Sequence, residues 1–125
     1  MAPMTVLEAA PAAMRDNAAW MADLEAEGPR FDAAVADLRD FVFRAVLVYV
    51  THRRAELSGL AHEELRQHAE DWAQRSVMQI LANRSAFAGR SRFTTWAYRI
   101  AINTAAAELR RKRWSDVSLD DPGDA

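Results

Sequence analysis

The segment from about residue 31 to residue 57 carries apolar side chains at helical spacing, and in its middle they surround the helix nearly completely. The residues that set this pattern are Val35, Leu38, Phe41, Val42, Ala45, Val46, Tyr49 and Val50. A helix that is apolar on most sides has to be covered by other helices. We therefore predict that it is the central and most buried helix of an all-α protein. Its longest apolar run, residues 45–50, is far too short to cross a bilayer, so we expect no membrane insertion.

The same spacing predicts three further helices, at about residues 11–26, at about residues 61–83 and from about Phe93 onward. Gly28-Pro29 separates the first helix from the second, and Ser58-Gly59 separates the second from the third. A polar loop, residues 83–92, precedes the fourth. Because only eight of the 125 residues are Gly or Pro, the expected fold is a compact bundle of about four helices.

The third predicted helix has an apolar face and a polar face. The inward residues are Leu65, Ala69, Trp72, Ala73, Val77, Ile80 and Leu81. The outward residues are Gln67, Glu70, Asp71, Gln74, Arg75 and Met78. A methionine among polar residues suits an adaptable protein contact, although a single surface methionine is common.

The fourth predicted helix also has two faces, and its cap region is expected at Ser91 or Arg92. The buried face is predicted to contain Phe93, Ala97, Ile100, Ala101, Thr104 and Ala105. The outer face contains Thr95, Arg99, Asn103, Ala106 and Arg110. Alanine permits a close approach, arginine neutralises phosphate, and asparagine can pair with an adenine edge. For Trp96 a place at the rim of the core and a role in stacking on a base both stay open. Periodicity predicts that Tyr98 is less exposed than Trp96.

Positive charge is concentrated in residues 84–114, where eight cations face a single acid, Glu108. The cations are Arg84, Arg90, Arg92, Arg99, Arg110, Arg111, Lys112 and Arg113. Such a block usually marks an anionic partner. Cations at the end of a helix also complement its dipole, but four in a row exceed what that effect needs. From the residues alone, nucleic-acid contact and a merely solvated basic end both stay open.

Signals for catalysis and metal binding are weak. The sequence HEELRQH, residues 62–68, does not place two histidines on one side of a helix, and the four glycines are isolated. Adjacent acids such as Glu70 and Asp71 do not face each other on a helix. We therefore expect no enzyme activity, no metal and no cofactor. The absence of cysteine and of a signal peptide pattern agrees with a cytoplasmic protein.

Five sequence pieces resemble region 2 of the bacterial sigma-70 family, specifically its extracytoplasmic-function (ECF) group. In order along the chain they are AEDWAQ, FAGRSRF, TWAYRIAIN, ELRRKR and SLDD. The ordered match covers about residues 41–121. We therefore expect a region 2-like domain at residues 31–114, followed by the start of an acidic linker at residues 115–125. Residues 1–30, which the resemblance does not cover, are expected to form an N-terminal helical extension.

The resemblance also implies partners and contact residues. In this family, region 2 binds the coiled coil of the polymerase beta-prime clamp. The residues expected to make this contact are Glu70, Asp71, Gln74, Arg75 and Met78. Region 2 also recognises the non-template strand of the promoter minus-ten element while the strands separate, and the loop 83–92 would hold a base flipped out of the stack. The DNA contacts would be Asn83, Arg84, Ser85, Arg90, Arg92, Trp96, Arg99, Asn103, Arg110, Arg111, Lys112 and Arg113. An anti-sigma partner is suggested only because members of this family are commonly regulated by one.

Several departures from the family pattern bear on these expectations. Arg75 stands where the family commonly has an acid, which alters the charge at the clamp contact. Arg99-Ile100 replaces the two tryptophans that housekeeping members use for melting, as is general in the ECF group. The helix-turn-helix for the minus-thirty-five element is absent, so we expect a fragment of a longer protein. A helical protein-interaction module without DNA reading remains the alternative function, and an enzyme acting on nucleic acid would need convergent carboxylates or a nucleophile.

Overall fold

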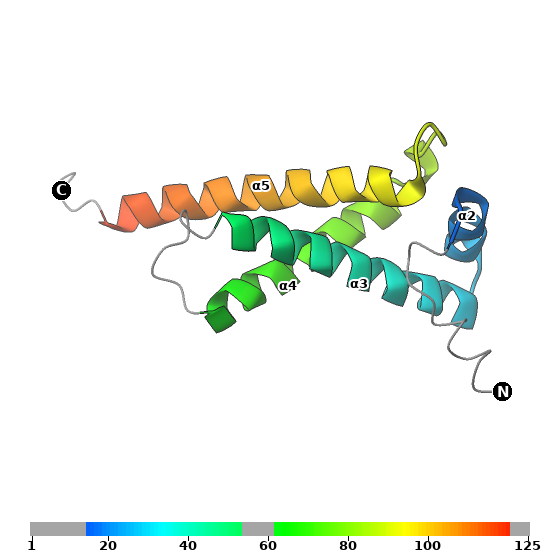
Figure 1. The fold of residues 1–125 in the computed structure, drawn as a ribbon, viewed down its shortest axis with the longest axis horizontal. Helices are drawn as coiled ribbons and strands as arrows, with labels where there is room; N and C mark the ends of the chain where they lie inside the picture. Colours follow the sequence, from blue (N-terminus) through cyan, green and yellow to red (C-terminus); the bar gives the residue numbers. More distant parts are fainter. Residues whose placement is uncertain (1–14, 54–61, 121–125) are drawn as a thin grey trace.

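The computed structural model describes residues 15–53 and 62–120, with side chains through Trp114. Its elements are the α-helices α2 (Asn17–Glu25), α3 (Pro29–His52), α4 (His62–Ala82) and α5 (Phe93–Asp120), with a short 3-10 helix, η3 (Arg84–Ala86), before α5. Figure 1 shows α3 and α4 crossing beneath the long α5, with α2 at one end of the bundle. Within the described residues all regular structure is helical, which confirms the predicted all-α bundle.

The break between the first two helices is shorter than the sequence pattern predicted. α3 begins at Pro29 rather than near Phe31, because proline suits the first helical position, where its missing N–H leaves no bond unmade. Gly28 precedes it with φ of 71°, a left-handed conformation that favours glycine. α2 begins at Asn17, after Asp16 accepts a 2.8 Å hydrogen bond from the backbone N–H of Ala19. The predicted helical residues 11–14, 54–57 and 61 lie outside the described residues.

α3 is central because it packs against α2, α4 and α5. Its fully buried residues recur every four positions: Ala34, Leu38, Val42, Val46 and Val50. The prediction that it is also the most buried helix is wrong, since α4 buries seven residues and α3 five. The reason is that the flanks of α3 are covered incompletely: Phe41 and Tyr49 are half-buried and Val48 is 55% exposed.

α2 contributes large side chains to the same core. Trp20 and Leu24 are each 1% exposed, and the Trp20 ring stacks on Phe93 of α5 with centroids 5.0 Å apart. The Arg15 guanidinium also lies over the Trp20 ring, 4.9 Å from its centre. Among the described residues the indole N–H of Trp20 has no hydrogen-bond partner. The ring is therefore held by packing and stacking.

An ion-pair cluster ties α2 to the start of α3. Asp23 accepts from Arg30 at 2.8 Å and from Arg15 at 3.1 Å, and Arg15 also pairs with Asp37. The hydrogen bond from Arg30 is the main cause that holds the pKa of the Asp23 carboxyl below its usual value, with Arg15 adding to it. Because the pKa is lowered in the folded state, this cluster stabilises the fold above the ordinary aspartate pKa. That contribution is lost as the pH falls through the lowered pKa.

Candidate nucleic-acid interface and partner face

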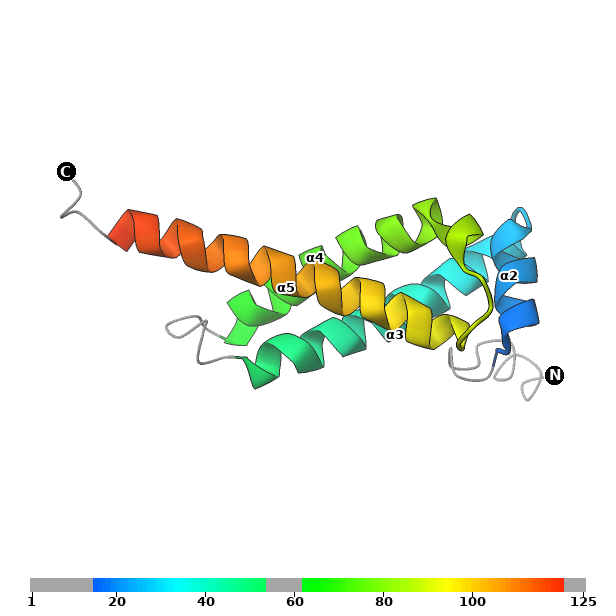
Figure 2. The same ribbon diagram turned by 90° about the horizontal axis from the view of Figure 1, so that it is seen from above.

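The loop 83–92 connects α4 to α5 and passes beside α2, as seen from above in Figure 2. Most of its side chains are exposed, and Gly89 adopts a φ of 75° with open space around it. Phe87 anchors the loop, because its ring meets Phe93 edge-on at 5.5 Å and lies 5.3 Å from the ring of Trp96. The loop is thus a polar surface held on an aromatic cluster of Phe87, Phe93 and Trp96.

Trp96 lies at the rim of this aromatic cluster. It is half-buried between Phe87 and Phe93, with part of the indole still facing solvent. Its contact with a nucleic-acid base stays a prediction. The expectation that Tyr98 would be less exposed than Trp96 is wrong, because Tyr98 is 46% exposed. The aromatic cluster covers Trp96, whereas none of the aromatic contacts of the described residues involves Tyr98.

Arg92 occupies the N-cap position of α5, as the sequence predicted, because its carbonyl accepts from the Trp96 N–H at 3.1 Å, but the side chain that caps the helix comes from α2. The Asn17 Oδ1 accepts from the backbone N–H of Phe93 at 2.8 Å, and the Asn17 Nδ2 donates to the carbonyl of Ser91 at 3.0 Å. The Ser91 hydroxyl donates instead to the carbonyl of Arg92. The side chain that accepts from the first N–H of α5 therefore lies 76 positions earlier in the chain, whereas most helices are capped by a side chain next to their first turn.

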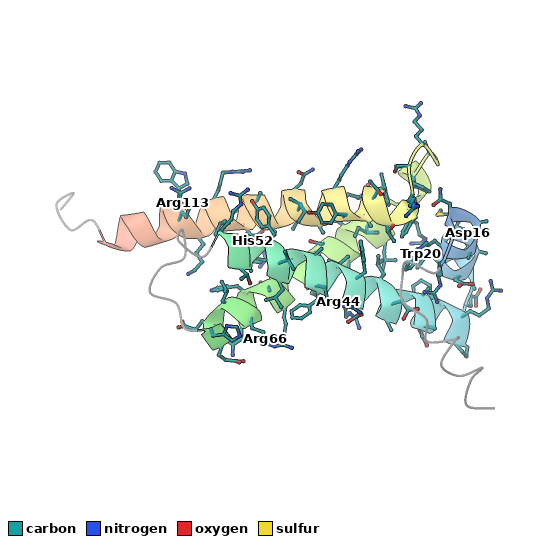
Figure 3. All side chains as sticks on the ribbon, in the orientation of Figure 1. Asp16, Trp20, Arg44, His52, Arg66 and Arg113 are labelled. Atoms are coloured by element: carbon teal, nitrogen blue, oxygen red, sulfur yellow. The ribbon has the colours of Figure 1, made fainter. Side chains whose placement is uncertain are left out.

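Five exposed residues, one just before α5 and four within it, share one helix face opposite the core. Residues separated by seven, four or three positions share a helix face, and the exposed side chains here recur with those steps. We call them the basic stripe: Arg92, Arg99, Asn103, Arg110 and Arg113. The opposite face holds the buried Phe93, Ala97, Ala101, Thr104 and Ala105, which confirms the predicted inward face except for the half-buried Ile100. The buried face also extends to Leu109, which was not predicted. Figure 3 places Arg113 toward the end of α5 that is remote from Asp16 and Trp20.

The arginines of the basic stripe form no ion pair within the described part of the chain, and neither does Arg90 of the loop. The helix dipole does not account for the cluster at residues 110–113 either. α5 continues to Asp120, about two turns further, and the dipole effect is confined to the last turn. Arg90 and the arginines of the basic stripe therefore project into solvent without an ion-pair partner in the described part of the chain.

Among the other predicted DNA contacts, Arg111 and Arg84 form internal ion pairs. Arg111 turns away from the stripe and pairs with Glu108, which also accepts from Arg75 of α4 at 2.9 Å. Arg84 donates to the carbonyl of Leu81 at 2.7 Å and pairs with Glu25 of α2 at 3.2 Å. The single acid of the basic block thus neutralises one of its cations, and Arg84 serves to join the loop to α4 and α2.

The outward face of α4 is as the sequence predicted. Gln67, Glu70, Asp71, Gln74, Arg75 and Met78 are all exposed, and Met78 is 62% exposed. Its acids are paired with cations on the same helix, Glu70 with Arg66 at 3.5 Å and Asp71 with Arg75 at 3.6 Å. Exposed pairs of this kind contribute little to stability, so they are easily exchanged for a partner's charges.

A groove between α3 and α4 adjoins this face and was not predicted. Its volume is about 460 Å³, and its wall from α4 includes Glu70 and Gln74. The remaining lining residues are Ala36, Arg39, Asp40, Phe43, Arg66 and Ala73. The Arg66 guanidinium lies 5.1 Å from the centre of the Phe43 ring. Helical periodicity places Arg39 and Asp40 on a polar face, but the packing of α3 on α4 is needed to bring them beside Gln74.

The described residues hold no group of three or more histidines, aspartates or glutamates that could bind a metal ion. In the same part of the chain, no helix combines the length and the apolarity needed to cross a membrane.

Comparison with known proteins identifies the family. The sequence pattern of Sigma-70 region 2 matches residues 35–115. The chain is also similar to the RNA polymerase sigma-H factor of Pseudomonas aeruginosa, with 44% identity over 59 residues. That alignment covers 44% of this chain and 31% of the relative, so the chain spans about a third of that protein's length. No solved structure matches the chain. With more than half of its residues matched, the chain belongs to the sigma-70 family and contains region 2, a non-enzymatic domain that recognises the promoter minus-ten element in transcription initiation.

Proposed function

We propose that this chain is the minus-ten reading and strand-opening domain of an ECF-type sigma factor, and that it binds the RNA polymerase core through α4. The observation that carries the proposal is the basic stripe of α5, whose arginines have no internal partner in the described residues. Cations without internal partners are available to neutralise the phosphates of the non-template strand. Arg99-Ile100 in place of a tryptophan pair resembles the ECF group.

The length of the stripe suits a short promoter element. Arg92 and Arg110 are 18 residues apart, which corresponds to about 27 Å along the axis of α5. At about 3.4 Å per nucleotide, that distance matches roughly eight nucleotides of one strand. Asn103 lies between the arginines, where a carboxamide can pair with an adenine edge.

The loop 83–92 supplies the chemistry for holding one extruded base. Ser85, Ala86 and Ala88 are exposed and small, so a base can approach the backbone closely next to Gly89. The Asn83 Nδ2 donates to the Gln79 carbonyl at 2.8 Å, which leaves the Asn83 Oδ1 as a possible acceptor for a base. Extrusion of a base costs a few kcal/mol, and contacts to the flanking phosphates from Arg90 and Arg92 would offset that cost.

Asn103 and the loop are expected to read different positions of the element. Asn103→Ala should reduce base preference at the upstream edge by about 1–3 kcal/mol, the usual size of a bidentate base contact. Exchange of residues 83–92 for the loop of another ECF factor should change the preferred base at one downstream position. The measurement is binding of single-stranded oligonucleotides with each of the four bases at every position. A loop exchange that weakens all oligonucleotides equally would mean that the loop only holds the strand.

The exposed face of α4 is expected to bind the coiled coil of the beta-prime clamp. Asp71→Ala combined with Gln74→Ala should weaken polymerase binding by roughly 1–2 kcal/mol, from the loss of polar contacts at an interface. Both positions are exposed and alanine favours helix, so the fold should be unchanged by circular dichroism. The control is Arg44→Gln, an exposed position on α3 outside this face. Equal polymerase affinity for the double variant and the wild type in a pull-down titration would refute this assignment.

A further inference from the structure

We propose that α2 is the positioning element of the loop 83–92, which it holds at both ends so that the loop can discriminate between bases. This inference rests on the proposed function, because it concerns how the same loop is made ready to read DNA. α2 precedes residues 35–115, the part that matches the family, and packs beside the loop (Figure 2).

The exit of the loop is fixed by one carboxamide. Asn17 uses both of its polar side-chain atoms, donating to the Ser91 carbonyl at 3.0 Å and accepting from the Phe93 N–H at 2.8 Å. Because the two bonds lie on either side of Arg92, they set the direction in which the chain enters α5. They also fix the backbone that carries the first cation of the basic stripe.

The entrance of the loop is tied to the same helix. The Arg84 Nε donates to Glu25 of α2 at 3.2 Å, while its Nη1 donates to the Leu81 carbonyl at 2.7 Å. Glu25 is 65% exposed, so this ion pair is the weaker of the two ties. Between these two ties to α2, the Trp20 ring of α2 stacks on Phe93. Phe87 of the loop packs edge-on against the same Phe93 ring. Both ends of the loop, and the aromatic cluster on which it packs, therefore contact α2.

Fixing the ends of a polar loop lowers the conformational entropy that it loses when it encloses a base. The phosphate contacts of the basic stripe are made mostly by α5, so they persist when the loop loosens. Loss of the Asn17 tie should therefore reduce discrimination between bases more than it reduces overall affinity.

The experiment compares Asn17→Ala with Ala22→Gly in this chain. Ala22 is exposed on α2, so glycine lowers the helix propensity without removing a contact to the loop. A third variant, Asn17→Asp, keeps an acceptor for the Phe93 N–H but loses the donor to Ser91. The measurements are amide hydrogen exchange of residues 84–93, affinity for single-stranded minus-ten oligonucleotides with all four bases at each position, and affinity for polymerase core.

For Asn17→Ala we expect amide exchange in the loop to be about 5- to 10-fold faster, the scale of one hydrogen bond. The preference between the best and the worst base at the loop's position should fall by a similar factor. Asn17→Asp should lie between Asn17→Ala and the wild type, and polymerase affinity should stay within about twofold, since α4 is untouched. The inference is overturned if Asn17→Ala and Ala22→Gly show the same rate of amide hydrogen exchange in the loop. It is also overturned if the two variants show the same preference between bases. A wild-type chain with no base preference would instead overturn the proposed function, and the role of α2 in reading with it.

Discussion

Replacing Trp20 by alanine is expected to lower the free energy of unfolding by about 3–5 kcal/mol, the usual cost of deleting a fully buried large aromatic side chain. Trp20 is 1% exposed and stacks on Phe93, so the deletion opens a cavity between α2 and α5. Such a loss is a large part of the roughly 5–15 kcal/mol that stabilises a typical domain. The measurement is equilibrium unfolding in urea, followed by circular dichroism.

Trp20→Phe provides the control for this prediction. The indole N–H has no hydrogen-bond partner among the described residues, so phenylalanine removes no hydrogen bond and keeps a ring against Phe93. We expect it to cost about 1–2 kcal/mol, from the reduced volume alone. If Trp20→Ala destabilised the protein no more than this, α2 would not be part of the core in solution.

The helices and their faces could be predicted from the sequence because they depend on local periodicity. The polar face of α4, from Gln67 to Met78, and the apolar face of α5 were both found this way, and the order of the quoted sequence pieces led to the correct family. Periodicity failed for Tyr98, since it ranks positions by angle but does not reveal which neighbour covers them.

The contacts around the loop could not be predicted, because they join residues far apart in sequence. The cap of α5 comes from Asn17, and the tie of Arg84 comes from Glu25, 59 positions away. Likewise, a run of four cations gives no sign that Arg111 turns toward Glu108 and Arg75 of α4. Each of these pairs is set by the packing of α2 or α4 against the rest, which no short sequence window contains.

Neutralising Arg110, Arg111 and Arg113 with glutamine is expected to flatten the salt dependence of DNA binding. Each phosphate contact to a single strand contributes about 0.7 to the slope of log affinity against log salt, so the slope should fall by about 2. Over a fourfold rise in salt, the affinity of the triple variant should change about sixteenfold less than that of the wild type. Binding of a single-stranded minus-ten oligonucleotide at several salt concentrations gives both slopes.

The internal ion pair divides this effect unequally among the three arginines. Arg110 and Arg113 lie on the basic stripe without a partner in the described residues, so each alone should lower the slope by about 0.7. Arg111 must first leave Glu108, so its single variant should change the slope less. Arg44→Gln on α3, an exposed arginine that pairs with Asp40, is the matched control and should leave the slope unchanged. A triple variant with the slope of the wild type would mean that the cluster is only a solvated surface and that the strand is held elsewhere.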